Sequence, residues 1–344
     1  MNLREIHHEV NARIHRVDFS LLWEGFKPLK FALYNEKECC LDGEYIEKTD
    51  QFLANTAIHY NGEYIAIWRL GEDVPDYDVL ASKIIHEMFH GFQYENQESR
   101  FPNELEALRK YAYSVANLTV KMKENHLISQ LVDTFDKDLF DRLLTLRKMR
   151  QANHPYEYRY EALIEQIEGS ANHVELESLR QLSTDKFHDA LERTKRHITD
   201  ANNLIPIRII SYSVGALLLR IIKNNTTILC EHFIDHAFSQ TLLDNIAYQE
   251  VQVEENPEVK ATLDQYHRQT RTMIDAALAK NDCVLEGKYP LIGVNVYDAR
   301  RLDHYIISTY FVAYKNADND AILHGDYLVE LDKDLDITKV YTLK

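Results

Sequence analysis

The spacing of apolar residues changes twice along the chain and divides it into three regions. Residues 1–75 open with helical spacing and continue with β-rich runs at 29–35 and 56–70. Residues 76–285 show helical spacing almost throughout, and residues 286–344 return to β-branched and aromatic runs. The pattern predicts a predominantly helical α+β protein. It has a small antiparallel sheet before its first long helix, a helical body and a β-rich C-terminal segment.

Turn-forming residues support this division. Asn61 and Gly62 stand between two β-rich runs, which is the strongest short-range signal for a hairpin. Prolines and polar breaks separate the helical segments. We expect helices over the ranges 77–97, 103–122, 127–150, 157–182, 185–200, 207–224, 227–237 and 257–280.

The first long helix carries the sequence His-Glu-Met-Phe-His at 86–90. Four residues advance an α-helix by roughly 6 Å and turn it by about 40°, so His86 and His90 point the same way from adjacent turns. Neutral imidazole nitrogens are good zinc ligands. Glu87 lies about 100° further round the helix than His86. From there it can reach a water held on the metal, which is the position of a general base.

A chance pair of histidines is the alternative interpretation, because the chain contains 16 histidines. His232 and His236 form a second pair with the same spacing, but Phe233 stands where the glutamate would be. The 86–90 segment differs because apolar residues surround it on every side of the helix, which predicts a buried helix. Buried polar groups need partners, and a bound metal would supply them.

A catalytic zinc usually has three protein ligands and one open position, so a third ligand is needed. Glu168 lies within the apolar stripe of the predicted helix 157–182, where an unpaired carboxylate is costly. Gly169 follows it and indicates the close approach of another helix, which we expect to be the 86–90 helix at Gly91. The rival ligands are Glu165, His173 and Glu175, and Glu175 is also a candidate outer-shell or substrate-side carboxylate. The alternative is that these carboxylates lie on a solvent-exposed face of the helix. We expect this for most of Glu161, Glu165, Glu175 and Glu177.

The segment HEMFH, followed by a helix containing EGSAN at 168–172, resembles the gluzincin branch of the zincin metallopeptidases. The resemblance covers roughly residues 55–220. It implies that Glu168 is the third zinc ligand and that Asn172 supports one of the histidines. The third histidine of the longer metzincin pattern is absent from this sequence.

The resemblance implies roles for two further residues. Gluzincins commonly use a tyrosine or histidine of a later helix to stabilise the developing oxyanion, and Tyr212 in the apolar segment 209–222 is the candidate here. The alternative is that Tyr212 only packs and finds one hydrogen bond. An edge strand binds the substrate backbone in zincins, so Asn55 near the second β-rich run is a candidate substrate contact. An ordinary sheet strand explains that segment equally well.

Composition and charge narrow the classes of function. The net charge is −16 and no cluster of lysines and arginines occurs, which argues against binding to nucleic acid. The first residues lack the apolar core of a secretory signal, and no apolar run is long enough for a membrane span. We therefore expect a cytoplasmic protein without a membrane partner. The four cysteines do not form a CxxC pair, so we expect them to be reduced and structural.

Together these features predict a zinc-dependent hydrolase, most simply a metallopeptidase that cleaves an amide bond with metal-activated water. The substrate is a peptide or another amide, and an ester is a further alternative. The rival class is a non-catalytic helical protein in which a metal, or a hydrogen-bonded His-Glu cluster, only stabilises two helices. A closed site with a fourth protein ligand such as His173 would favour that rival.

Overall fold

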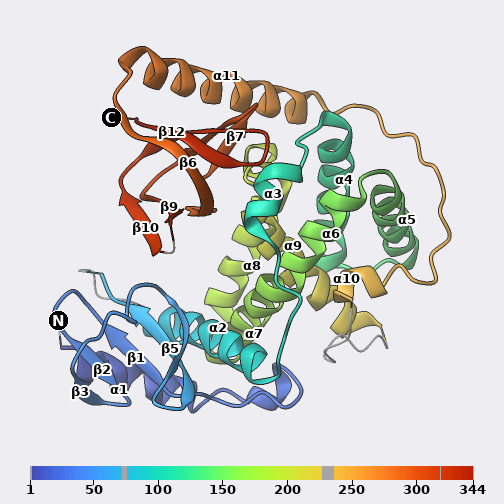
Figure 1. The fold of residues 1–344 in the computed structure, drawn as a ribbon. Helices are drawn as coiled ribbons and strands as arrows, with labels where there is room; N and C mark the ends of the chain where they lie inside the picture. The colour runs from blue at the N-terminus through green and yellow to red at the C-terminus, as the bar shows by residue number, and fades with distance from the viewer. Residues whose placement is uncertain (1, 72–75, 227–235, 318, 344) are drawn as a thin grey trace.

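The computed structural model describes residues 2–71, 76–226, 236–317 and 319–343 (Figure 1). An N-terminal sheet is followed by a helical body, and a C-terminal sheet with one long helix closes the chain. The predicted α+β class is therefore confirmed. The expected helix at 227–237 and the second histidine pair at His232 lie largely outside the described residues.

The N-terminal sheet has five strands in the order β3-β2-β1-β5-β4. Strands β1 and β5 pair in parallel, whereas the other neighbours are antiparallel, so the sheet is mixed and not wholly antiparallel as predicted. The difference arises because the chain returns to the starting end of β1 before β5 begins. The strands are β1 (Phe31–Tyr34), β2 (Cys39–Leu41), β3 (Glu44–Ile46), β4 (Thr56–Tyr60) and β5 (Glu63–Arg69).

The predicted hairpin joins β4 to β5. Tyr60 pairs with Glu63, and the two residues between them have positive φ angles of 50° at Asn61 and 91° at Gly62. Positive φ at both central positions is the requirement of the two-residue turn that suits hairpin twist. The hairpin leaves β4 at the edge of the sheet.

The helical body packs around one large apolar core. None of the described helices is both long enough and apolar enough to span a membrane. The α-helices are α1 (Leu3–Ile14), α2 (Tyr77–Glu95), α3 (Glu104–Lys110), α4 (Val115–Asp133), α5 (Lys137–Asn153), α6 (Pro155–Ile164), α7 (Ser170–Leu182), α8 (Thr184–Thr199), α9 (Ile207–Asn225), α10 (Phe238–Thr241) and α11 (Pro257–Lys280). Shorter turns are η1 (Phe19–Leu21), η2 (Glu165–Gly169) and η3 (Ala201–Leu204).

Three of the predicted helix ranges differ from the structure. The ranges 103–122 and 127–150 become three helices, because polar caps start new helices inside them. Ser114 accepts a hydrogen bond from Asn117 N at 3.2 Å, and Asp136 accepts one from Leu139 N at 2.9 Å. The single helix expected over 157–182 is interrupted by η2, one turn of π-helix.

The solvated face expected for most of Glu161, Glu165, Glu175 and Glu177 is wrong, because three of the four are buried and Glu175 is half-buried. Glu161 and Glu165 are fully buried, as are the four charged side chains around them. Arg150 Nη1 lies 2.7 Å from Glu161, and Arg147 Nη2 lies 2.6 Å from Glu165. The whole cluster, here called the buried charge network, consists of Lys121, Glu124, Arg147, Arg150, Glu161 and Glu165.

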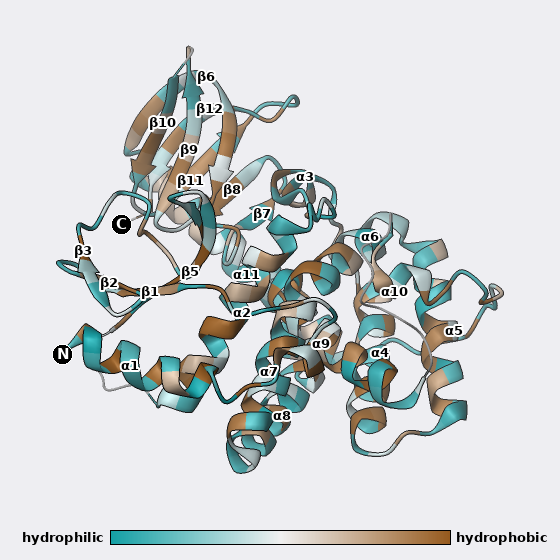
Figure 2. Cartoon of the chain, turned by 90° about the horizontal axis from the view of Figure 1, so that it is seen from below, coloured by the Kyte–Doolittle hydropathy of each residue, from teal (hydrophilic) through white to brown (hydrophobic). Residues whose placement is uncertain are grey.

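The C-terminal sheet has seven strands in the order β10-β9-β6-β12-β11-β8-β7. The strands of this sheet carry both hydrophobic and hydrophilic residues (Figure 2). Along β9, half-buried and buried residues alternate over the first four positions, as expected for a strand with one buried face. Helix α11 covers part of the sheet through Ile274 and Ala277. The strands are β6 (Cys283–Val294), β7 (Arg300–Leu302), β8 (Tyr305–Ser308), β9 (Phe311–Asn316), β10 (Asn319–His324), β11 (Tyr327–Leu331) and β12 (Asp336–Thr342).

Removing one partner of the buried charge network should strongly destabilise the fold. Glu165→Ala leaves Arg147 and Lys121 without one of their anionic partners in the interior, which costs about 3–5 kcal/mol. The free energy of unfolding from urea titration measures this loss. Glu106→Ala is the matched control, because Glu106 forms an exposed ion pair with Lys110 and should leave stability nearly unchanged. Equal effects of the two substitutions would contradict the role given to the network.

Candidate metal centre

Helix α2 presents both predicted histidines. Asp76 caps its N-terminus by accepting hydrogen bonds from the backbone of Asp78 and Val79, and one face of the helix packs on β5. His86 and His90 lie one turn apart with their ring centroids 4.8 Å from each other. Their Nε2 atoms are separated by 3.1 Å, so the two rings converge as the spacing predicted.

Glu168 reaches the histidines from the π-helical turn η2. Within the same turn, Glu165 points into the buried charge network. The wider π turn rotates Glu168 further away from Glu165 than α-helical geometry would, and so directs it toward α2. Isolated π turns are frequent at functional sites, which suits this position.

The close helix approach at Gly169 involves a different partner from the one predicted. A Cβ atom at Gly169 would stand 2.7 Å from the Cα atom of Gly215, so η2 lies directly against α9. Gly91 makes room instead for Leu29 and for the hairpin residues Ala57 and Tyr64. The two glycines therefore serve different contacts, and only Gly169 sets the position of the π turn.

His86, His90 and Glu168 form a candidate metal-binding triad. Glu168 Oε2 lies 3.4 Å from His90 Nε2 and 4.0 Å from His86 Nε2. A tetrahedral ion with bonds of about 2.0–2.1 Å holds its ligand atoms about 3.3 Å apart. The 3.1 Å between the two imidazole nitrogens is slightly shorter than this value, and the two distances to Glu168 are longer.

The other ring nitrogens of the histidines both face oxygen atoms. His90 Nδ1 lies 2.8 Å from Gln93 Oε1, and His86 Nδ1 lies 3.2 Å from Glu175 Oε2. The orientation of the Gln93 amide is fixed, because its nitrogen donates to Ile167 O at 3.0 Å and to Ser170 Oγ at 3.1 Å. Protons on both Nδ1 atoms leave two Nε2 lone pairs directed at each other, which is the arrangement that a metal ion requires.

The supporting role predicted for Asn172 belongs to other residues. Glu175 and Gln93 provide the oxygen atoms at the two histidines, and Asn172 provides neither. Asn172 is half-buried on α7, one turn beyond Glu168. The prediction of Glu175 as an outer-shell carboxylate agrees with its contact to His86.

The two carboxylate oxygen atoms of Glu168 contact different partners, and Arg208 is one of them. Its Nη2 donates to Glu168 Oε1 at 2.9 Å, while Oε2 faces the histidines. Its Nη1 pairs with Glu104, which also accepts a hydrogen bond from Tyr160 at 2.6 Å. Because one oxygen is held by the guanidinium, Glu168 offers the other as a single ligand atom.

Two carboxyl groups of the site have opposite electrostatic environments. Burial raises the pKa of Glu168, but His90, His86 and Arg208 outweigh burial and lower it to about 2. The pKa of Glu87 is raised above its usual value, because burial outweighs the attraction of the histidines. Glu168 is therefore ionised at neutral pH, whereas Glu87 is protonated more readily than an ordinary glutamate.

The remaining predicted site residues lie at different distances from this triad. Tyr212 on α9 packs beside Arg208, which pairs with Glu168, and the guanidinium lies 5.3 Å from the centroid of the tyrosine ring. Burial and the Glu168 carboxylate raise the pKa of Tyr212 above its usual value. The Tyr212 hydroxyl is buried and has no hydrogen-bond partner among the described residues. Asn55 accepts from Arg69 N at 2.8 Å and lines a surface depression that contains none of the triad residues. His173 is buried against Ala216 of α9 and is not part of the triad.

Two residues of the site were missed from the sequence. Gln93 stands three positions after His90, on the same helix face, so its spacing alone indicated a contact. Arg208 stands at the start of an apolar helix, and its pairing with Glu168 joins segments 40 residues apart. The spacing signal was available for Gln93, whereas no local pattern indicated the partner of Arg208.

Comparison with known proteins gives no match, whether to a protein family, a curated protein or a solved structure. The class of this protein is therefore described from its own fold and site: it is an α+β protein with a candidate His-His-Glu metal centre between α2 and η2.

Metal affinity should separate three residues of this centre. Glu168→Ala removes a ligand atom and should weaken zinc binding more than 100-fold, because the loss of an outer partner typically costs about 10–100-fold. Glu175→Ala should fall within that smaller range, since it removes the oxygen at His86 Nδ1. Asn172→Ala is the control and should bind zinc like the wild type. Chelator competition titrations measure the three affinities, and tight binding by Glu168→Ala would refute the assigned ligand.

Zinc binding should displace a proton from the histidine pair. Burial lowers the pKa of His86, but Glu175, Glu87 and Glu168 outweigh it and raise the pKa to about 9. The metal-free site therefore holds a proton at neutral pH, and the zinc affinity should increase with pH up to about that value. Calorimetric titration in buffers of different ionisation enthalpy counts the released protons. Release of none at pH 7 would contradict this description of the metal-free site.

Proposed function

We propose that this protein is a zinc-dependent hydrolase of the gluzincin type that cleaves an amide bond, most simply in a peptide. The observation that carries the proposal is the convergence of His86, His90 and Glu168 on one point, with Glu87 on the same helix. An ester is the alternative substrate, because the same activated water would attack it. The assignment of activity rests on this geometry and on the sequence resemblance.

The donor set fits zinc. Two imidazole nitrogens and one carboxylate oxygen are the ligands of many catalytic zinc sites. Glu175 and Gln93 orient the histidines from behind, as outer partners of zinc ligands do. Zinc bound at this triad would supply Lewis acidity and lower the pKa of a bound water.

Glu87 is proposed as the general base. Its side chain follows His86 directly, and its neighbours leave the group only 8% exposed. The raised pKa of Glu87 suits a group that accepts a proton from water and returns it to the leaving amine. The lowered pKa of Glu168 suits a permanent ligand, so the two carboxyl groups divide these roles.

The geometry favours an enzyme over the structural alternative. A structural zinc site is closed by four protein ligands, whereas a catalytic site leaves one position for water. His173, the expected fourth ligand of a structural site, lies against α9. Among the described residues, the group of potential ligand atoms contains three members.

Tyr212 is the proposed donor to the developing oxyanion. Its hydroxyl is buried and has no hydrogen-bond partner in the part of the chain that the structure describes. The Arg208 guanidinium lies over its ring at 5.3 Å from the centroid, which holds the ring in place. The edge strand β4 is the proposed site for the substrate backbone, since it is the last strand of its sheet and packs against α2 near Gly91.

Glu87→Gln should retain zinc and lose hydrolysis. The amide has nearly the same size but cannot accept a proton, so turnover should fall by about 10²–10⁴-fold. Cleavage of a quenched fluorescent peptide library by the zinc-loaded protein measures turnover, and elemental analysis measures zinc content. His86→Ala is the companion variant and should lose zinc and activity together. Near-normal cleavage by Glu87→Gln with zinc bound would contradict the proposed base.

A further inference from the structure

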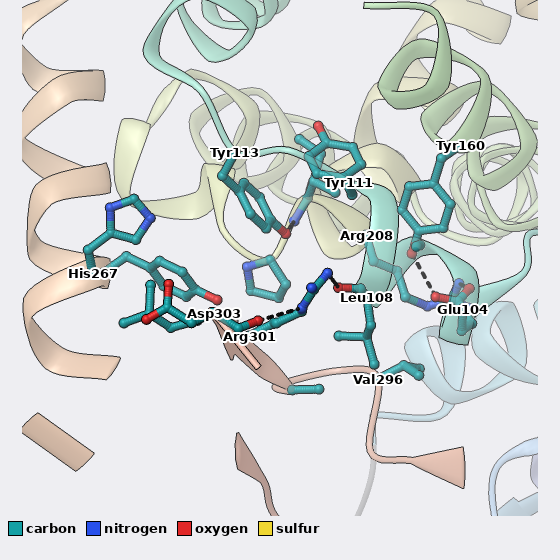
Figure 3. A pocket seen from close by; sticks show the side chains of 16 residues that line it. Glu104, Leu108, Tyr111, Tyr113, Tyr160, Arg208, His267, Val296, Arg301 and Asp303 are labelled. Atoms are coloured by element: carbon teal, nitrogen blue, oxygen red, sulfur yellow. Dashed lines mark hydrogen bonds and ion pairs between the residues drawn. The ribbon is translucent and has the colours of Figure 1, made fainter. Parts of the chain in front are cut away.

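A cavity of about 270 Å³ lies where the helical body meets the C-terminal sheet (Figure 3). Its walls come from α3, α6, α9 and α11 and from the segment around β7. Junctions between structural units are common places for ligand sites. The cavity exceeds the roughly 150 Å³ of an apolar cavity that accommodates benzene.

Most residues that line this cavity are aromatic or apolar. The hydroxyls of its tyrosines are already engaged: Tyr111 donates to Glu161 at 2.7 Å and Tyr113 accepts from Ile207 N at 3.1 Å. These tyrosines therefore contribute ring surface more than free hydrogen-bonding groups. Val296 and Ala299 line it from the C-terminal segment. Such a lining favours a flat apolar group over a polar one.

The charged residues of the cavity are compensated within the protein. Arg301 donates to Leu108 O at 3.1 Å and also to the next backbone carbonyl of α3. Asp303 pairs with Arg271 at 2.5 Å. Figure 3 shows Arg208 and Glu104 together at one end of the cavity, far from His267. The cavity thus selects for an uncharged ligand group.

Arg208 connects the cavity to the metal centre. One edge of its guanidinium holds the ligand Glu168, and the other pairs with Glu104 in the cavity wall. One guanidinium group therefore separates the end of the cavity from a metal ligand. The Nε atom of Arg208 is buried and has no acceptor among the described residues, so one donor remains for an oxygen atom of a ligand.

We propose that this cavity binds an aromatic side chain of the amide substrate, next to the bond that is cleaved. The inference rests on the proposed hydrolase function and adds its substrate class. The ring would lie among the tyrosines while the amide group reaches the triad past Arg208. Substrates with an aromatic residue beside the scissile bond are then preferred over those with a small residue.

Two zinc-binding hydroxamates test this proposal without a known substrate. Acetohydroxamic acid carries a methyl group, whereas 3-phenylpropionohydroxamic acid carries an aromatic ring on a short linker. We expect the zinc-loaded wild type to bind the phenyl probe at least about tenfold more tightly by calorimetry, because ring burial adds to chelation. Ala299→Phe fills the cavity and should reduce this advantage to less than about threefold while leaving the affinity for acetohydroxamate unchanged.

Two further variants make the result interpretable. Val296→Phe fills the cavity from a second position and should act like Ala299→Phe. Ala54→Phe is the control, because Ala54 is exposed and lines the separate depression beside Asn55. Equal affinity of the wild type for both probes, or an advantage that survives both filling variants, would overturn this inference alone. Binding of neither probe would overturn the proposed function and this inference with it.

Discussion

The structure depends on two imidazole nitrogens that face each other at 3.1 Å. With protons on both Nδ1 atoms, the facing Nε2 atoms carry lone pairs that repel, so the pair needs a cation between them. The environment supplies the matching negative charges, because the carboxylates of Glu175, Glu87 and Glu168 surround the pair. A proton meets this requirement in the metal-free state, and a metal ion of suitable size meets it more fully.

The scaffold positions the third member of the site from the opposite side. Glu165 is held by Arg147 in the buried charge network, and Glu168 is held by Arg208, so the π turn is fixed by an ion pair on each side. Gly169 and Gly215 allow that turn to lie against α9. Buried ion pairs add little net stability, but they penalise any arrangement that separates them. The network therefore serves to fix the direction of Glu168.

Local signals predicted the parts of the fold that depend on neighbouring residues. The ends of α2, the hairpin at Asn61 and Gly62, and the convergence of His86 and His90 follow from spacing within a few residues. These features confirm that helix periodicity and turn chemistry carry information on their own. The choice of Glu168 also followed from a local rule, the cost of a carboxylate in an apolar stripe.

The failures concern contacts between distant segments. The burial of Glu165 was not predicted, because its partner Arg147 comes from another helix. The π turn covers only five residues, which is too short to change the apolar periodicity of the segment, so periodicity did not reveal it. The parallel pairing of β1 with β5 depends on how the intervening chain returns, which no local pattern specifies. For the same reason, the sequence did not reveal that Arg208 pairs with Glu168. It also did not reveal that Gln93 and Glu175, and not Asn172, face the two histidines.

The central claim is that one zinc ion binds between α2 and η2. Anomalous diffraction at the zinc edge from crystals of the zinc-loaded protein tests it most directly. The account predicts a single strong peak at bonding distance, about 2.0–2.2 Å, from His86 Nε2, His90 Nε2 and one oxygen atom of Glu168. A peak bonded to other side chains, or no peak between the two histidines, would contradict the account.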